Sequence, residues 1–135
     1  MNTQPAQRFL VVGADAQYAR WLRHRIEAMR EDTQVDVAAL ADFDPQARGD
    51  DDLRLLIFVL SFAGETEPAE DGVSPGLAFL RALAASSPRV PYLVIAEGGN
   101  ELSAIASLRN GATDYLPRGL LTPERLGAGI EYCLA

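Results

Sequence analysis

The sequence predicts an α/β fold in which five parallel strands form one doubly wound sheet with helices on both faces. Short apolar runs, of the kind that suits strands buried on both faces, alternate along the chain with stretches of helical periodicity. The alternation is clearest over residues 91–135, where strand, helix, strand and helix follow one another with almost no residues between them. This alternation is typical of parallel sheets covered on both sides.

The first half of the chain provides three strands and two helices. The apolar runs 8–13, 35–40 and 54–60 are the expected strands, and the third is the most continuous of them. A helix over 16–30 is predicted from one apolar stripe at spacings of four and three residues, made by Tyr18, Leu22, Ile26 and Met29. Residues 42–49 can hold only a short, irregular helix, broken by Pro45 and ended by Gly49.

The second half begins with a loop over 63–76 that is rich in Gly, Pro and acidic residues. A loop of that length is uncommon in a compact domain unless it is mobile or functional. Its acidic residues lack the spacing of a calcium-binding EF-hand, so we interpret it as an acidic loop: Glu65, Glu67, Glu70 and Asp71.

Helix signals mark the remaining elements. A third helix is expected over 77–85, followed by a strand over 91–96. Asn100 can cap a fourth helix that ends at Asn110 and Gly111, and a short strand over 113–116 comes next. Thr122 and Pro123 then open the last helix, with a capping hydroxyl and a proline in the first turn.

Length, composition and charge indicate one acidic domain over 1–135. No apolar run approaches the roughly 18 residues of a membrane span, and the N-terminus lacks a signal-type segment. The chain has a single cysteine, Cys133, which is compatible with a reducing cytoplasm. A formal net charge of −7 argues against general nucleic-acid binding. We therefore expect a soluble cytoplasmic domain.

One segment resembles a known family signature. Gly111-Ala-Thr-Asp-Tyr-Leu-Pro-Arg118 is similar to the fifth-strand signature of response-regulator receiver domains, which commonly reads Gly-Ala-x-Asp-Tyr-Leu-x-Lys-Pro. The spacing of strands and helices matches that family over nearly the whole chain. The resemblance implies a flavodoxin/CheY-like (βα)5 fold with strand order 2-1-3-4-5 and a site at the carboxyl ends of the strands.

The family's chemistry is phosphorylation of an aspartate. It needs an acidic pair for magnesium after strand one, the acceptor aspartate at the end of strand three, a hydroxyl after strand four and a lysine after strand five. The resemblance matches these positions to Gly13 with Ala14, Val59, Ala96 and Arg118.

Four of these five positions lack the required chemistry. A two-residue shift would move the acceptor to Ile57, but no Asp or Glu occurs between residues 54 and 64. Asp15 is acidic, but it lies one place after the pair. Arg118 keeps only the positive charge, and its guanidinium is not equivalent to an ammonium. We predict a domain that forms no aspartyl phosphate, holds no metal and uses no cofactor.

The resemblance also gives a candidate interface. Tyr115 matches the switch aromatic of active receivers, whose ring moves when the strand-four hydroxyl moves. Because Ala96 stands at the hydroxyl position here, that coupling is lost, and the remaining roles for Tyr115 are packing or contact with a partner. Many receivers dimerise through helix four, strand five and helix five. Glycines weaken helices, so those of the last helix should have a packing reason. We expect a homodimer or a docked protein partner on this face, with these candidate contacts: Arg109, Asp114, Tyr115, Gly127 and Ala128.

Two further features have competing interpretations. Arg20-Trp-Leu-Arg-His-Arg25 on the first helix is either a binding patch for a nucleotide or acidic partner, or a solvated helix face, and we favour the second. His24 has no cysteine or carboxylate at ligand spacing, and Cys133 lies near an apolar stripe, which predicts a packed thiol.

The function expected from the sequence is a phosphorylation-independent interaction module that is not an enzyme. The alternative is a sensor that binds a small anion or metabolite in the vacated pocket. The segment 121–134 looks like the final helix of receivers that precede sensor, GGDEF or EAL domains. By that analogy we expect the N-terminal domain of a longer bacterial signalling protein, FimX-like and related to cyclic-di-GMP.

Overall fold

A computed structural model of the chain describes residues 7–39, 53–61, 75–86, 89–98 and 101–135. Within them, five parallel strands form one sheet in the order β2-β1-β3-β4-β5, which confirms the predicted fold class and strand order. The elements in chain order are β1 (Gln7–Gly13), α1 (Ala16–Met29), β2 (Thr33–Ala39), β3 (Leu53–Ser61), α2 (Pro75–Ser86), β4 (Tyr92–Glu97), α3 (Glu101–Arg109), β5 (Asp114–Pro117), the short 3-10 turn η2 (Arg118–Leu120) and α4 (Pro123–Leu134).

The sequence placed the five strands and the four α-helices of the described residues within two residues of their observed ends. The turn η2 was not predicted. Three predicted features lie outside the described residues: the helix over 42–49, most of the acidic loop over 63–76, and the cap at Asn100.

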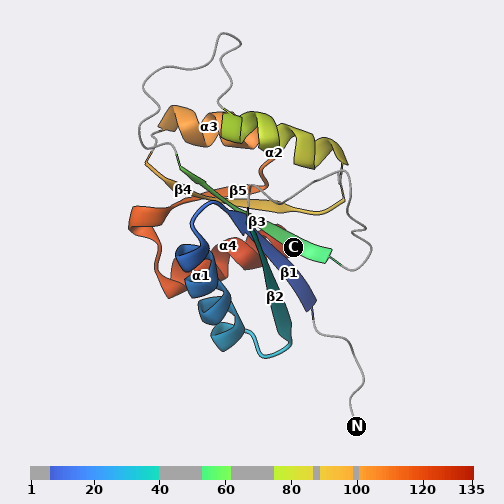
Figure 1. Cartoon of the computed structure of the whole chain (residues 1–135), viewed down its shortest axis with the longest axis vertical. Helices are drawn as coiled ribbons and strands as arrows, with labels where there is room; N and C mark the ends of the chain where they lie inside the picture. Colours follow the sequence, from blue (N-terminus) through green and yellow to red (C-terminus); the bar gives the residue numbers. More distant parts are fainter. Residues whose placement is uncertain (1–6, 40–52, 62–74, 87–88, 99–100) are drawn as a thin grey trace.

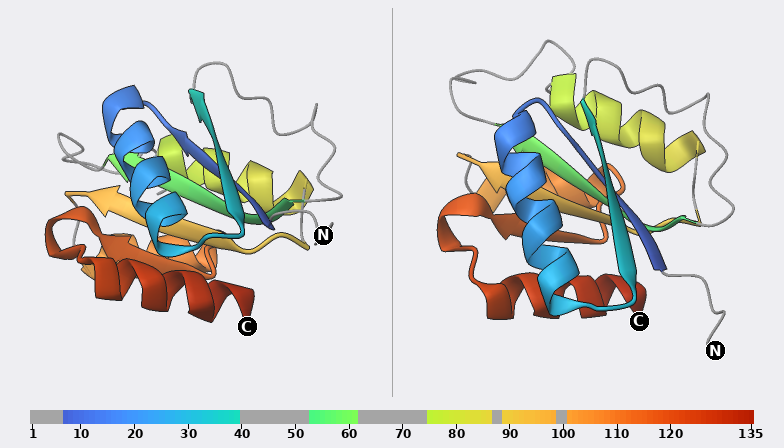
Figure 2. Two further views of the ribbon diagram at one scale, coloured as in Figure 1. Left: turned by 90° about the horizontal axis from the view of Figure 1, so that it is seen from below. Right: turned by 60° about the horizontal axis from the view of Figure 1, so that its bottom comes forward.

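Helices cover both faces of the sheet, with α1 and α4 on one face and α2 and α3 on the other (Figure 1). The two further views in Figure 2 show α1 and α4 on the same side of the twisted sheet. An ion pair between Arg30, at the end of α1, and Glu131 of α4 joins this pair of helices. In the described part of the chain, no helix has both the length and the apolar composition needed to cross a membrane.

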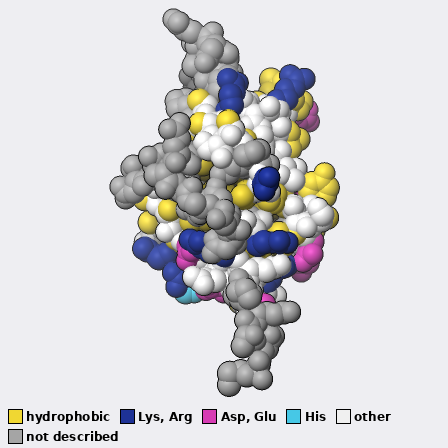
Figure 3. All heavy atoms as spheres, turned by 90° about the vertical axis from the view of Figure 1, so that its right-hand side faces the viewer, with side chains coloured by type: hydrophobic (Ala, Val, Ile, Leu, Met, Phe, Trp, Pro, Cys, Tyr) yellow, Lys and Arg dark blue, Asp and Glu magenta, His cyan; other side chains and the backbone are white. Residues whose placement is uncertain are grey.

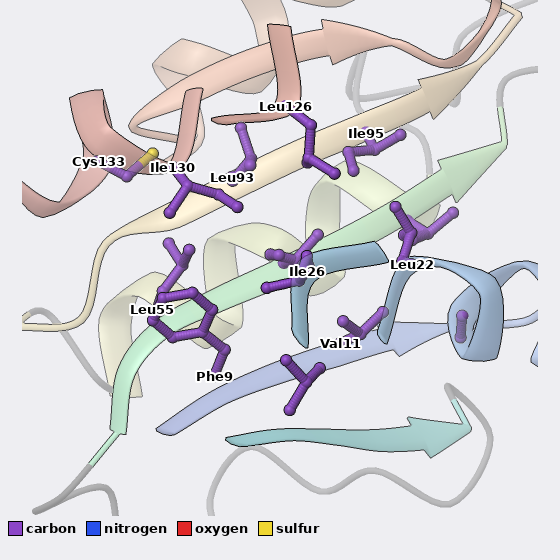
Figure 4. Packing of buried hydrophobic residues seen from close by; sticks show 14 residues of the cluster. Phe9, Val11, Leu22, Ile26, Leu55, Leu93, Ile95, Leu126, Ile130 and Cys133 are labelled. Atoms are coloured by element: carbon purple, nitrogen blue, oxygen red, sulfur yellow. The ribbon is translucent and has the colours of Figure 1, made fainter. Parts of the chain in front are cut away.

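Each face of the sheet has its own hydrophobic core. Figure 4 shows the core under α1 and α4, where side chains from β1, β3 and β4 meet those of the two helices. Its largest fully buried members are Phe9, Leu22, Ile26, Leu55, Ile57, Leu93, Ile95, Leu126 and Ile130. The second core, under α2 and α3, includes Val12, Phe58, Leu80 and Val94. Because β3 and β4 contribute to both cores, residues 55–60 and 92–96 are buried without interruption.

Side-chain caps begin the two helices of the first face. The Asp15 carboxylate accepts the backbone N–H of Tyr18 at 3.1 Å, which satisfies one free donor at the start of α1. Thr122 does the same for Arg125 at 3.2 Å, and Pro123 occupies the first turn of α4, as predicted.

Candidate functional site

The carboxyl ends of the strands meet at one edge of the sheet, where parallel α/β sheets usually bind ligands. In register, Gly13 of β1 lies opposite Val59 of β3. Ala96 of β4 lies opposite Leu60 on one side and Pro117 on the other. The positions that the resemblance matched to a phosphorylation site therefore come together at this edge.

The floor of this edge is apolar and closely packed. Val59 is 9% exposed and Ala96 is 1% exposed. A Cβ built on Gly13 would lie 3.0 Å from the Cβ of Val59, so the two strands leave room there for a hydrogen and little more. Ile57, the alternative acceptor position, lies in β3 two residues before Val59 and is fully buried. Ala14 is exposed above the floor.

Arg118 extends across the edge from the end of β5. Its Nη1 donates to the Glu97 Oε2, at the end of β4, over 3.1 Å. The same nitrogen lies 3.9 Å from the Asp15 Oδ2, before α1. Its guanidinium carbon lies 3.7 Å from the centre of the Tyr18 ring. The positive charge of Arg118 is thus balanced by two carboxylates of its own chain.

The sequence identified Arg118 but missed these partners. Asp15 was noted only as an acid one place too late for a magnesium pair, and its capping of α1 was not expected. Glu97, the residue after Ala96, was given no role. A signal was present: each carboxylate adjoins a matched position, and carboxylates near an arginine at the same sheet edge should pair with it.

The contact with Tyr18 is one end of a stack that runs along α1. The Tyr18 ring stacks on Trp21, with ring centres 5.5 Å apart and an interplanar angle of 23°. The guanidinium carbon of Arg25 lies 5.3 Å from the centre of the Trp21 ring. The Arg118–Tyr18–Trp21–Arg25 stack therefore places an arginine at each end of two aromatic rings, an arrangement that both rings favour electrostatically.

The pKa of Tyr18 is raised above its ordinary value, mainly because the side chain is partly buried. The charge of Arg118 lowers the pKa and the charge of Glu97 raises it, but both effects are smaller than that of burial. Tyr18 is therefore a neutral phenol at neutral pH.

No metal centre is assembled in the part of the chain that the structure describes, where no three His, Cys, Asp or Glu side chains come close enough to hold an ion. His24 is exposed on α1. Residues 65–71, with their carboxylates, lie outside the described ranges.

The candidate interface residues fall on two different surfaces. We define the α3–β5–α4 face as the outer surface of α3, the edge strand β5 and the side of α4 next to β5. Arg109 is exposed at the end of α3, Asp114 and Tyr115 are half-buried in β5, and Ala128 is exposed on α4. Burial raises the pKa of the Tyr115 hydroxyl above its ordinary value.

Gly127, the fifth candidate, lies on the side of α4 that faces α1. A Cβ built on it would lie 3.3 Å from the Met29 Cε, so this half-buried glycine lies against α1 and not on the α3–β5–α4 face. A Cβ on Gly129 would lie 3.0 Å from the Leu116 Cδ1 of β5. The two glycines of α4 thus have the packing reason that their helix-weakening character suggested.

An apolar stripe on α3 was missed by the sequence analysis. Leu102 is 73% exposed, Ile105 is 46% exposed and Leu108 is 48% exposed. Their spacing of three residues places them along one side of the helix. The spacing of these three residues is visible in the sequence, but exposure depends on which side of α3 faces the sheet, and spacing alone does not give that.

Charged groups of both signs are interspersed over the described part of the face in Figure 3. That part of the surface has no extensive basic patch of the kind that binds a nucleic-acid backbone.

Comparisons with solved structures identify receiver domains as structural neighbours. A response-regulator receiver protein from Pseudoalteromonas atlantica matches with a TM-score of 0.72 at 16% identity, over 94% of this chain and 96% of that chain. A Burkholderia thailandensis protein named for pilus assembly, CpaE, gives a TM-score of 0.68 at 16% identity, over 93% and 96%. NtrX from Brucella abortus, solved in complex with ATP, gives 0.70 at 23% identity, over 96% of this chain and 27% of NtrX.

No protein-family model matches the sequence, and no curated protein matches it. Identities this low carry the fold and not the activity. The strand order, the helices on both faces and these neighbours lead to one conclusion: the chain has the CheY-like fold of response-regulator receiver domains.

Proposed function

We propose that this chain is a receiver-like signalling domain that acts by contact with other proteins, without accepting a phosphoryl group and without catalysing a reaction. The observation that carries the proposal is the carboxyl edge of the sheet. Val59 stands at the acceptor position, packed against Gly13, and Arg118 is already paired with Glu97 and Asp15. Phosphoryl transfer needs a nucleophile at the acceptor position and a cation to balance the transferred charge. Here the acceptor position holds an aliphatic side chain, and the Arg118 cation is already paired.

The paired arginine supports a fixed conformation. Glu97 ends β4, Asp15 precedes α1 and Arg118 follows β5, so one side chain links three elements at this edge. In a phosphorylated receiver, a metal ion and a phosphoryl group would provide the charges at this place. Here the chain's own side chains provide them, which fits a domain whose surface does not depend on modification.

The α3–β5–α4 face is the proposed contact surface. Leu102, Ile105 and Leu108 expose an aliphatic stripe on α3, and exposed aliphatic groups of this kind gain free energy when a partner covers them. Stable interfaces bury about 800 Å² per partner, which is more than one short helix offers. Tyr132 of α4, 64% exposed one turn after Gly129, extends the face beyond β5.

The simplest partner is a second copy of this chain. Glu101 and Arg109 lie at opposite ends of α3, and no described residue forms an ion pair with either. If two α3 helices pack antiparallel across a twofold axis at Ile105, Leu102 meets Leu108 of the second copy. Glu101 then meets Arg109 of the second copy, twice by symmetry.

Sedimentation velocity tests the dimer. We expect a concentration-dependent dimer that Ile105→Glu abolishes, while Ala82→Glu, an exposed site on α2, leaves it intact. Glu101→Arg or Arg109→Glu alone should weaken the dimer, and the two together should restore it. A monomer at all concentrations would leave a different protein as the only possible partner at this face.

Beryllofluoride with magnesium tests the absence of phosphorylation. The amide resonances of Gly13, Val59 and Ala96 should not move, whereas those of an aspartate-bearing receiver treated in parallel should. Saturable shifts at these residues would overturn the proposal.

The alternative, a small-anion sensor at the same edge, has less support. Its binding group would be Arg118, and an anion would have to displace the contact with Glu97 at 3.1 Å. A thermal-shift screen with phosphate and nucleotides tests it, since a ligand at a hundred times its Kd adds about 2.7 kcal/mol of stability.

The wider setting is also a proposal. We place the domain in a composite bacterial signalling protein, of the GGDEF and EAL type linked to cyclic-di-GMP. The support is the resemblance in its last helix, together with a neighbour named for pilus assembly. The residues that follow this segment in the gene would test it directly.

A further inference from the structure

A groove of about 160 Å³ lies between α1 and the start of α4, away from the α3–β5–α4 face. Trp21, Arg25 and Met29 line it from α1, and Leu121, Pro123 and Leu126 line it from the other side. Its volume suits one bulky side chain. Small-molecule sites usually have volumes of roughly 300–1,000 Å³, so a groove of this size is suited to anchoring a segment and not to enclosing a ligand.

The α1 wall of this groove is exposed although it is apolar. Trp21 is 42% exposed and Met29 is 39% exposed. Leu120, immediately before the opposite wall, is 59% exposed. Tryptophan and arginine in a preformed pocket are the residues that most often anchor protein interfaces.

The charge of α1 indicates which kind of partner would bind in the groove. Helix α1 carries Arg20, Arg23 and Arg25 against one acid, Glu27, so its formal charge is +3 − 1 = +2 in a chain of net charge −7. Arg23 lies 3.7 Å from Glu27, but within the described residues neither Arg20 nor Arg25 forms an ion pair. A basic helix beside an apolar groove favours a partner with both carboxylates and an apolar anchor.

The groove is also held in shape before any partner binds. In the Arg118–Tyr18–Trp21–Arg25 stack, Trp21 is fixed between Tyr18 and Arg25, so less side-chain freedom remains to be lost on binding. The stack begins at the carboxyl edge, where Arg118 pairs with Glu97. The residue that closes the edge therefore also supports the wall of the groove.

We propose that the α1–α4 groove docks an acidic segment of a protein partner. One bulky aliphatic or aromatic side chain of the segment enters between Trp21, Met29 and Leu126, and its flanking carboxylates pair with Arg25 and Arg20. From the sequence alone we favoured a solvated face for this basic cluster; the groove beside it is the new observation. The site is separate from the α3–β5–α4 face, and either can fail without the other.

The chain's one tryptophan provides the measurement, because Trp21 lines the groove. The probe is a synthetic peptide with a central Leu-Phe pair flanked by glutamates, and its control has lysines in place of the glutamates. We expect the acidic peptide to change Trp21 fluorescence saturably and to shift the NMR signals of Arg25, Met29 and Leu126. The lysine peptide should do neither.

Variants separate this site from the other face. Arg25→Glu and Met29→Glu should each weaken binding by about tenfold or more. Ile105→Glu on α3 should leave it unchanged. Circular dichroism checks that the variants are folded, which is expected because these side chains are exposed or partly exposed.

Four results would overturn the proposal: no binding of the acidic peptide at millimolar concentration, equal binding of the lysine peptide, shifts that cluster on α3, or binding of a single-stranded oligonucleotide in place of the peptide. None of these bears on whether the domain dimerises or accepts a phosphoryl group.

Discussion

The guanidinium carbon of Arg118 lies 3.7 Å from the centre of the Tyr18 ring. This contact joins the end of β5 to the first turn of α1, two elements that are far apart in the sequence. It also turns a residue matched to a phosphate-binding lysine into an internal structural group. A lysine could not reproduce it equally, because a planar guanidinium stacks on a ring face whereas an ammonium acts as a point charge.

Replacement of Tyr18 tests the value of this contact. Tyr18→Phe keeps the ring and should lower the free energy of unfolding by less than Tyr18→Leu, which removes it. The difference should be about 0.5–1 kcal/mol, the usual range for a cation–π contact near the surface. Urea denaturation followed by Trp21 fluorescence measures it. Equal effects of the two substitutions would mean that the stack contributes no stability.

The ion pair between Arg118 and Glu97 should be weak but measurable. The side chains are 31% and 53% exposed, so solvent screens their attraction. A double-mutant cycle with Arg118→Gln and Glu97→Gln should give a coupling of about 0.2–1 kcal/mol, which falls in 1 M salt. Asp15, at 3.9 Å, should couple less strongly to Arg118 than Glu97 does. The reverse order would contradict the geometry described here.

The fold could be predicted from the sequence because each predicted element has a local signal. The apolar runs of β3 and β4, the stripe on α1 and the Thr122 cap all lie in contiguous residues, so periodicity and capping chemistry locate them. The turn η2 was missed because a single 3-10 turn after β5 has no periodicity to detect.

The site was only half predictable. The absent acids at Gly13, Ala14 and Val59 are visible in the sequence, since an absence needs no geometry. The pairing of Arg118 with Glu97 was not, because 21 residues separate them and only the register of β4 and β5 brings their ends together. Resemblance to a family located the positions, but it could not say what now fills the space.

Gly13 should resist even a small side chain. In Gly13→Ala the new methyl carbon would lie 3.0 Å from the Val59 Cβ, closer than ordinary contact, so the strands must move. We expect a loss of about 1–3 kcal/mol in the free energy of unfolding. The same substitution in a Val59→Ala background should cost clearly less, because the clash is reduced. Purely additive effects in guanidinium denaturation would show that the close approach is not the cause.

Gly111 has two reasons to be glycine. Its φ is +116°, and a Cβ there would lie 2.5 Å from the Ala84 Cβ of α2. Gly111→Ala should therefore cost about 2 kcal/mol or more, from backbone strain and from the clash. Adding Ala84→Gly should recover the part due to the clash and leave the part due to strain. Thermal unfolding of both variants, with Ala84→Gly alone as the control, separates the two contributions.

Cys133 should make stability fall with rising pH. Burial, with a smaller contribution from the nearby Asp114, raises the pKa of the thiol from its ordinary value of 9.0 to about 12. Below pH 9 the thiol is protonated in both the folded and the unfolded chain, and it adds no pH dependence. Above pH 9 the unfolded chain loses this proton while the folded chain keeps it, so the unfolded state is favoured.

The free energy of unfolding should then fall by up to about 1.4 kcal/mol per pH unit above pH 9. Urea titrations from pH 8 to 10 measure this slope, and Cys133→Ala should reduce it. The raised pKa values of Tyr18 and Tyr115 act in the same direction at higher pH and persist in that variant, so the difference between the two curves belongs to the thiol. The native thiol should also react with iodoacetamide far more slowly at pH 8 than it does in urea, because alkylation needs the thiolate. A thiol that reacts at the same rate in both conditions would mean that Cys133 is not packed as described.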